Sequence, residues 1–159
     1  MKAVTVTVLK KELQEHSHQE LIDICLKLAK FKKENKELLT YLLFDSHDED
    51  EYIRSVNDEV DEEFTKLNHY SLYYVKKSLR KILRIIKKYI RYSKKKETEA
   101  ALLLHFCSKL KELRPTHQKS IQIHNMYERQ LNMAKKAIST LHEDLQYDFQ
   151  LEIEALAER

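Results

Sequence analysis

This chain of 159 residues contains no glycine and a single proline, Pro115. Average proteins use about 7% glycine and about 5% proline. Glycine supplies the positive-φ positions that primed hairpin turns, β-bulges and phosphate-binding loops require. Its absence excludes glycine-rich nucleotide loops and disfavours β-rich folds. The sequence therefore predicts an all-α protein whose helices are joined by short polar links.

Cysteine is scarce, and long apolar runs are missing. Cys25 and Cys107 do not form a CxxC pair, which excludes a zinc ribbon and a dithiol redox motif. Both lie in apolar helical contexts, so we expect two small, buried, free thiols.

No apolar run reaches the length of a membrane span, and no signal-peptide core follows Met1. We expect a soluble cytoplasmic protein without a transmembrane segment.

Apolar residues recur at helical spacing through most of the chain, although 35% of the residues are charged. Capping boxes, in which a Ser or Thr is followed three residues later by Glu, start at Ser17, Ser46 and Thr140. Pro115 marks a helix stop. These signals predict helices over about residues 7–15, 18–33, 35–44, 48–67, 71–92, 97–113, 116–139 and 141–157.

Short links between helices favour antiparallel neighbours. We therefore expect a single all-α domain over residues 1–159 with about eight antiparallel helices. A helical bundle and a short HEAT-like α-α superhelix both satisfy this pattern, and no internal repeat decides between them.

Charge is distributed unevenly along the chain, although the net charge is only +3. Between Asp45 and Glu63 there are ten acidic residues and one basic residue, Arg54. Between Phe64 and Lys96 there is no acidic residue, and eleven Lys and Arg follow from Lys76 onward. An acidic fourth helix is thus followed by a basic fifth helix.

At 100° per residue the expected fifth helix has one apolar and one cationic side. The apolar stripe comprises Leu72, Val75, Leu79, Ile82, Leu83, Ile86 and Ile90. The opposite side carries Lys77, Lys81, Arg84, Lys88, Arg91 and Lys95 in steps of four and three, here called the basic row. Tyr70, Tyr73, Tyr74 and Tyr92 lie on or beside it, and we take Tyr73 and Tyr92 as its aromatic contacts.

Three interpretations of the basic row stay open. In the first, it is a solvated face that the acidic fourth helix partly neutralises. In the second, it binds nucleic acid, with lysine and arginine on the phosphates and tyrosines on unpaired bases. In the third, it docks an acidic protein or, weakly, an anionic membrane surface. The sequence pI of about 8.7 lies below the range above about 9 typical of dedicated nucleic-acid-binding domains.

Catalytic and metal-binding patterns are weak. The pairs Glu12/His16, His47/Glu51 and His124/Glu128 have helical ligand spacing, and we expect His117 and His124 to share one helix face two turns apart. None of these pairs has further ligands placed by the sequence. No nucleophile elbow is possible without glycine. We expect no catalytic residues, no cofactor and no resident metal.

The opening of the chain resembles a known family. Three segments carry the resemblance: LKKEL over residues 9–13, SHQELID over residues 17–23, and KENKELLTYL over residues 33–42. Together they make the N-terminal quarter similar to a family of small all-helical bacterial proteins of unknown function. The resemblance implies a bacterial source and an all-helical fold, and it assigns no site residue.

Our interpretation from sequence is a non-enzymatic helical interaction or scaffold protein that engages an acidic partner through the basic row. The alternatives are an RNA- or DNA-binding protein that uses the same surface and a metal-binding helical protein. A homodimer through the apolar stripe of the last two helices is a further possibility for its assembly.

Overall fold

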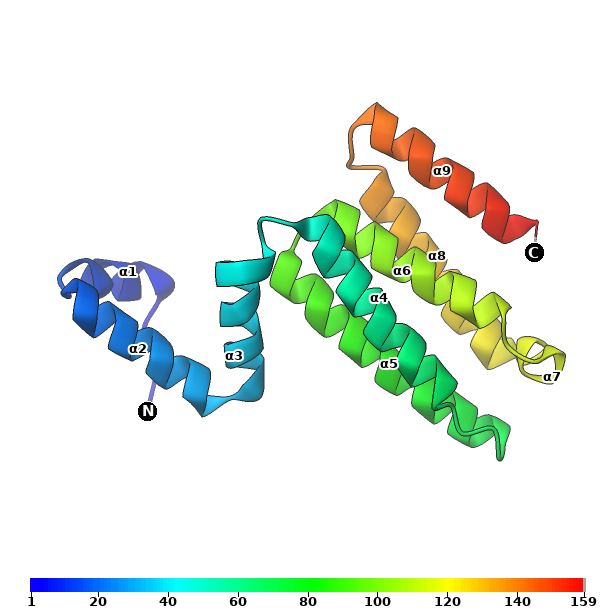
Figure 1. Cartoon of the computed structure of the whole chain (residues 1–159), viewed down its shortest axis with the longest axis horizontal. Helices are drawn as coiled ribbons and strands as arrows, with labels where there is room; N and C mark the ends of the chain where they lie inside the picture. The colour runs from blue at the N-terminus through cyan, green and yellow to red at the C-terminus, as the bar shows by residue number, and fades with distance from the viewer. Residues whose placement is uncertain (159) are drawn as a thin grey trace. The chain divides into compact units, whose positions relative to one another are not determined.

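The computed structural model describes residues 1–158, and within that range every regular element is helical (Figure 1). The predicted all-α fold class is therefore confirmed. The elements are α1 (Val6–Gln14), α2 (His18–Phe31), α3 (Lys33–Thr40), a π-helical turn (Tyr41–Asp45), α4 (Glu49–Thr65), α5 (Leu72–Ser93), α6 (Lys96–Lys111), α7 (Pro115–Gln118), α8 (Ile121–Ile138) and α9 (Glu143–Ala157).

The contacts group the chain into two compact units, Met1–Phe44 and a second unit that begins at Asp45. The expectation of a single all-α domain over residues 1–159 stays a prediction.

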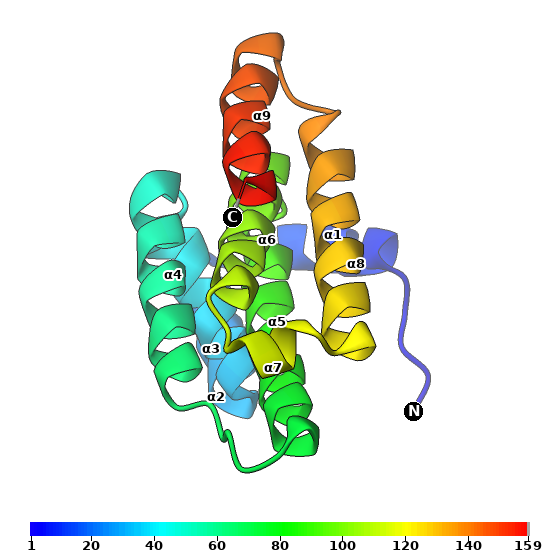
Figure 2. The same ribbon diagram turned by 90° about the vertical axis from the view of Figure 1, so that its right-hand side faces the viewer.

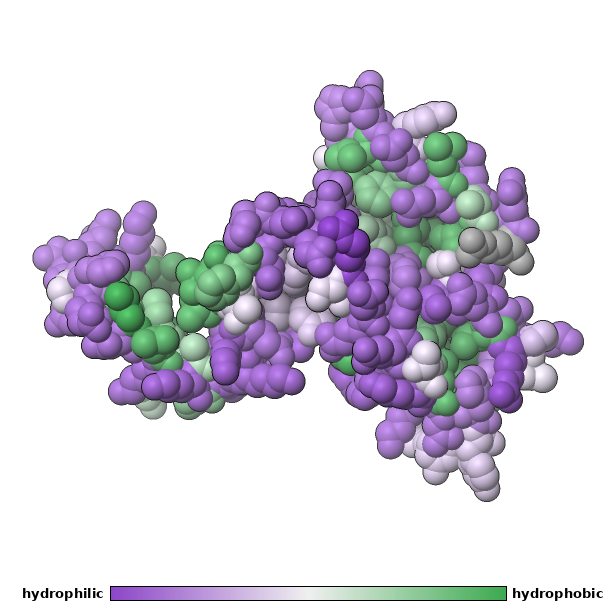
Figure 3. All heavy atoms as spheres, in the orientation of Figure 1, coloured by the Kyte–Doolittle hydropathy of each residue, from purple (hydrophilic) through white to green (hydrophobic). Residues whose placement is uncertain are grey.

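The first unit is small, and α2 begins with the capping box expected at Ser17, whereas α3 follows Lys32 without a side-chain cap. The Ser17 hydroxyl accepts from the backbone N–H of Glu20 at 3.3 Å, and the Glu20 carboxylate accepts from the N–H of Ser17 at 2.7 Å. The Asn35 amide donates to the Leu28 carbonyl at 2.8 Å and joins α2 to α3. Much apolar surface of this unit stays exposed (Figure 3), including Leu28, Phe31, Leu42, Leu43 and Phe44.

In the second unit, consecutive long helices run antiparallel and α6 is central (Figures 1 and 2). Helix α6 packs on α4, α5, α8 and α9. Because it has neighbours on several sides, it is apolar around most of its circumference rather than along one stripe. Its buried residues are Thr98, Ala100, Leu102, Leu103, Leu104, Phe106, Cys107 and Leu110.

The core of this unit forms where the apolar stripe of α5 meets α4 and α6. Val75, Leu79, Ile82 and Ile86 are each at most 1% exposed, as the periodicity predicts. From α6, Phe106 is fully buried, and its ring lies 5.7 Å from that of Phe64 on α4. This packing fixes which side of α5 faces inward and leaves its cationic side at the surface.

Helix α5 ends without the usual glycine. Lys94 adopts the left-handed conformation, with φ of 58°, and its N–H donates to the Ile90 carbonyl at 2.8 Å. A left-handed L-residue costs roughly 1–2 kcal/mol. The resulting turn is very short and starts α6 at Lys96, which brings Lys95 back toward the beginning of α4.

The predicted helix over residues 116–139 is wrong, because the structure divides it. The short α7 starts at Pro115, and a break at residues 119–120 precedes α8. The Gln118 side chain donates to the carbonyls of Lys111 and Leu113, at 2.5 and 2.7 Å, and so holds α7 against the end of α6. These hydrogen bonds span only five and seven residues, and they accompany a break that the apolar periodicity of residues 116–139 does not indicate.

The two cysteines differ in exposure, and the prediction that both are buried is wrong for Cys25. Cys25 is exposed because it faces outward from α2. Cys107 is fully buried, its Sγ lies 3.8 Å from the Tyr127 carbonyl, and burial raises the pKa of its thiol to about 12. Only Cys25 is therefore set up to react in the folded protein.

We expect one thiol of the native protein to react promptly with Ellman's reagent, and two after denaturation in guanidinium. A Cys25→Ser variant should show almost no reaction until it unfolds. The absorbance of the released thiolate measures both. Prompt reaction of two thiols in the native protein would contradict the burial of Cys107.

The apolar stripe of the last two helices packs inside the second unit. Leu131, Ala134 and Ile138 on α8 are buried, as are Phe149 and Leu156 on α9. These side chains are the ones from which sequence reasoning drew a dimer surface. These members of the stripe are already covered, whereas Tyr127, Leu145 and Ile153 of the same stripe are half-buried, and the homodimer stays a prediction.

Candidate anionic-partner interface

The acidic helix α4 lies antiparallel to the basic helix α5 and forms ion pairs with Lys81 and Lys95 of the basic row. Lys81 Nζ lies 2.6 Å from the Glu63 carboxylate, and Lys95 Nζ lies 3.2 Å from that of Glu49. Lys95 also donates to the Ser46 carbonyl at 3.2 Å. The acidic helix thus covers part of the basic row, at two separate points along α5.

The carboxylates of Glu49 and Glu59 on α4 also accept hydrogen bonds from uncharged side chains. The Glu49 carboxylate accepts from Ser93 at 2.8 Å and from Thr98 through a short hydrogen bond, which ties the start of α4 to the α5–α6 turn. The Glu59 carboxylate accepts from the Tyr89 hydroxyl at 2.6 Å. Lys88 lies over the Tyr89 ring, with Nζ 4.6 Å from its centre. Lys81, Lys88 and Lys95 therefore form a flank of the basic row that interacts with neighbouring groups.

The remaining cations of the basic row have no such neighbours. Lys77, Arg84 and Arg91 are exposed, and within residues 1–158 none has a carboxylate partner. Two cations outside the predicted row share this environment: Arg80 and Lys87 are also exposed. Together these residues form a continuous line in steps of three and four, here called the open ridge: Lys77, Arg80, Arg84, Lys87 and Arg91.

Sequence reasoning missed Arg80 and Lys87 for a geometric reason. The basic row was centred directly opposite the apolar stripe of α5. At 100° per residue the open ridge is centred roughly 40° to one side of it, away from the flank that faces α4. To select Arg80 and Lys87 from the sequence, one would need to know on which side of α5 the helix α4 packs. A helical wheel of α5 alone does not contain that information.

The open ridge carries uncompensated like charge. Neighbouring cations at i,i+3 and i,i+4 on a helix repel each other by about 0.2–0.5 kcal/mol per pair. The open ridge contains four such neighbouring pairs and no intervening acid. An anion lying along the ridge would relieve this repulsion. Its length, from residue 77 to residue 91, is about 21 Å at 1.5 Å per residue.

Tyrosines extend the open ridge at the start of α5. Tyr73 is 62% exposed and lies one helical turn before Lys77. Tyr70 is 88% exposed, in the link before α5. The Tyr74 ring packs edge-on against both, with ring centres 6.0 Å from Tyr70 and 5.3 Å from Tyr73. We call Tyr70, Tyr73 and Tyr74 the tyrosine cluster.

Tyr92 does not belong to this surface, which corrects its selection as an aromatic contact. It is only 9% exposed, and its ring packs edge-on against Tyr89 with the centres 5.9 Å apart. At the carboxyl end of α5 the aromatic groups therefore serve packing. The exposed aromatic surface is confined to the amino end.

Two histidines join the link before α5 to α7. The rings of His69 and His117 stack with centres 5.3 Å apart, and His69 Nδ1 lies 3.2 Å from His117 Nε2. Burial and the positive charge of Arg114 hold the pKa of His69 below its usual value. The contact anchors the segment that carries Tyr70.

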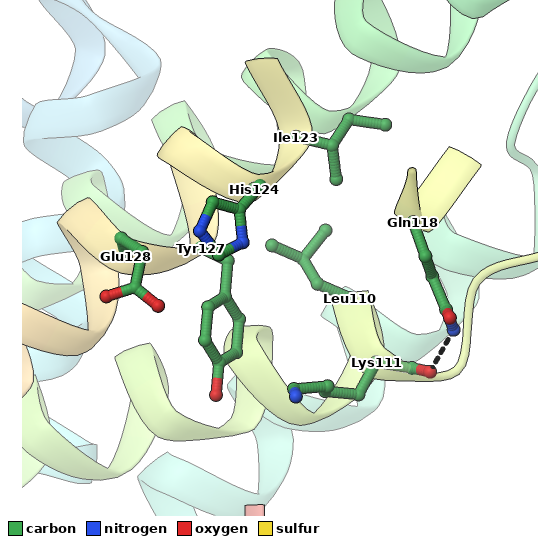
Figure 4. A pocket seen from close by; sticks show the side chains of 7 residues that line it. All are labelled: Leu110, Lys111, Gln118, Ile123, His124, Tyr127 and Glu128. Atoms are coloured by element: carbon green, nitrogen blue, oxygen red, sulfur yellow. Dashed lines mark hydrogen bonds between the residues drawn. The ribbon is translucent and has the colours of Figure 1, made fainter. Parts of the chain in front are cut away.

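His117 and His124 do not share a helix face, contrary to the sequence prediction. His117 is buried on α7 against His69, whereas His124 is exposed on α8. Figure 4 shows His124 with Tyr127 and Glu128 at the edge of a shallow pocket of about 200 Å³. Within residues 1–158 no three His, Cys, Asp or Glu side chains gather closely enough to hold a metal ion. The structure therefore brings no further ligand to the sequence-predicted pairs.

A second polar contact lies between α4 and α6. His105 Nε2 is 2.7 Å from Asp61 Oδ1, and Lys109 Nζ is 3.8 Å from the same oxygen. The imidazole lines a cleft of about 380 Å³ between α4, α6 and α9, together with Asn57 and Glu152. Asp61 is thereby directed toward α6 rather than toward the open ridge.

Comparison with known proteins gives no match to a family model, a curated protein or a solved structure. The resemblance of the N-terminal quarter to small helical bacterial proteins therefore stays a prediction. In the described part of the chain, none of the helices combines the length and the apolar character needed to cross a membrane.

Proposed function

We propose that this protein is a helical binding protein whose open ridge engages an anionic macromolecule. The observation that carries this proposal is the open ridge itself. Its Lys and Arg side chains are exposed and have no acidic partner within the described residues 1–158, although α5 lies beside a strongly acidic helix. The neighbouring carboxylates go to other groups: Glu51 to Arg54, Glu59 to Tyr89, and Asp61 to His105.

This distribution argues against the solvated-face interpretation as a full account. If α4 served only to neutralise α5, its carboxylates would pair along the whole cationic side. They pair instead at Lys81 and Lys95 and leave the open ridge aside. Each neighbouring pair of cations on the open ridge keeps a repulsion of about 0.2–0.5 kcal/mol that α4 does not relieve.

The test is the salt dependence of binding to a short single-stranded oligothymidylate and to a glutamate-rich peptide. For a single strand, log K falls with log salt with a slope of about −0.7 for each neutralised phosphate. If all five cations of the open ridge neutralise a phosphate, the slope is about −3.5, and if about three do, the slope is about −2. The affinity should then fall by roughly 16- to 130-fold between about 50 and about 200 mM salt.

A peptide nucleic acid strand of the same base sequence is the matched control, because its backbone carries no charge. We expect it to bind far more weakly than the oligothymidylate at low salt. Failure of both anionic probes to bind at about 50 mM salt would contradict the proposed function, as would binding that salt does not weaken.

A further inference from the structure

We infer that the anionic partner is a single-stranded nucleic acid, which lays its phosphates along the open ridge and stacks unpaired bases on Tyr70 and Tyr73. This inference rests on the proposed function, because it names the partner of the same surface. It adds a second element, the tyrosine cluster, which attraction of charge alone does not require.

The rings of Tyr70 and Tyr73 are largely uncovered. Tyr70 and Tyr73 are 88% and 62% exposed, and within residues 1–158 no hydrogen bond is made by either hydroxyl. A tyrosine ring typically buries about 150–250 Å² when it packs. Two largely uncovered rings, each touching Tyr74, therefore leave considerable apolar contact area unused. Every nucleobase has a flat face that can cover such a ring.

The Tyr70 and Tyr73 rings are held in place before any base binds. Tyr74 is the less exposed member of the cluster, and its ring contacts those of Tyr70 and Tyr73 at interplanar angles of 69° and 82°. The His69–His117 contact holds the residue next to Tyr70. Two rings braced in this way lose little conformational freedom when a base stacks on them, which favours binding.

The aromatic and cationic groups lie on the same side of α5. At 100° per residue Tyr73 has nearly the same direction around α5 as Arg91, and it lies about 40° from Lys77. The Tyr73 ring therefore continues the line of the open ridge at its amino end, and Tyr70 precedes it in the link before α5. A positively charged track with adjacent aromatic rings is the arrangement used for single-stranded nucleic acids.

The arrangement also discriminates between partners. An acidic peptide supplies carboxylates for the open ridge but no succession of flat π faces for the rings. A duplex supplies phosphates but keeps its bases stacked on one another, away from exposed tyrosines. A single strand supplies both, since its unpaired bases are free to stack on aromatic side chains.

The experiment measures fluorescence anisotropy of labelled probes with the wild-type chain and a Tyr70→Ala/Tyr73→Ala variant. The probes are an oligothymidylate, an abasic strand of equal length, a duplex and a glutamate-rich peptide. Loss of the two rings, each worth about 1–3 kcal/mol of stacking, should weaken oligothymidylate binding roughly 30-fold or more and leave binding of the abasic strand unchanged. Wild-type protein should prefer the oligothymidylate to the abasic strand and the duplex.

Two control variants test whether the effect depends on the ring faces and on their position. Tyr70→Phe/Tyr73→Phe keeps the ring faces and should retain wild-type affinity. Tyr147→Ala removes a ring that is 66% exposed on α9, far along the chain from the open ridge, and should change nothing. Far-ultraviolet circular dichroism of each variant checks that the helices remain.

The outcomes separate the inference from the proposed function. Equal wild-type affinity for the oligothymidylate and the abasic strand overturns the inference, as does an unchanged affinity of the Tyr70→Ala/Tyr73→Ala variant for the oligothymidylate. Salt-sensitive binding of the glutamate-rich peptide alone leaves the proposed function standing with a protein partner. Absence of binding by every probe rejects both.

Discussion

Replacing Arg80, Arg84 and Lys87 with glutamate should lower the affinity for an oligothymidylate at least about 100-fold at about 50 mM salt. These three side chains occupy the centre of the open ridge and are exposed. The change removes three of its five cations and adds three anions, which repel the phosphates that approach the rest of the ridge. Because all three face solvent, helix α5 should keep its apolar stripe and the fold its stability.

Helix α8 offers a matched control with the same change in net charge. Arg129, Lys135 and Lys136 are also exposed, and their replacement with glutamate should weaken binding by less than about threefold, through the overall charge of the chain. Titration of both triple variants with the labelled oligothymidylate gives the comparison. Equal losses in the two variants would mean that net charge, and not the open ridge, governs binding.

Phe106→Ala should destabilise the second unit by about 3–5 kcal/mol. The ring is fully buried on the central helix α6 and packs against Phe64 on α4. Truncation therefore removes buried apolar surface and leaves a cavity between two helices that position α5. Since domains are stable by only about 5–15 kcal/mol, this single change should consume a large part of the total.

Denaturant unfolding followed by circular dichroism measures this effect. Phe31→Ala is the matched control, because that ring on α2 is 76% exposed and its loss should shift the free energy of unfolding by less than about 0.5 kcal/mol. A Phe106→Ala variant as stable as the wild-type protein would contradict the central position of α6.

The main helices were predictable because their cause is local. On α4 and α5 the apolar residues repeat with the period of a helix, and the expected ranges of 48–67 and 71–92 match Glu49–Thr65 and Leu72–Ser93 closely. The capping box at Ser17 also forms as its spacing implied. What could not be predicted depends on side-chain contacts that the apolar periodicity does not indicate. The break between α7 and α8 depends on Gln118 bonding back to Lys111 and Leu113.

The candidate site was predicted in part for the same reason. Its helix and its overall polarity follow from the sequence of residues 76–96 alone. The split between a paired flank at Lys81 and Lys95 and an open ridge at Arg80 and Lys87 depends on the side from which α4 approaches. The exposure of the tyrosines depends likewise on packing, which covers Tyr92 and leaves Tyr73 uncovered.

Amide chemical-shift mapping of the labelled protein with an oligothymidylate tests the account most directly, because it locates the partner without a mutation. We expect the largest shifts over residues 70–91, at the tyrosine cluster and along the open ridge, and small shifts on α8 and α9. Largest shifts on α8 or α9, with α5 unaffected, would contradict the assignment of the open ridge as the binding surface.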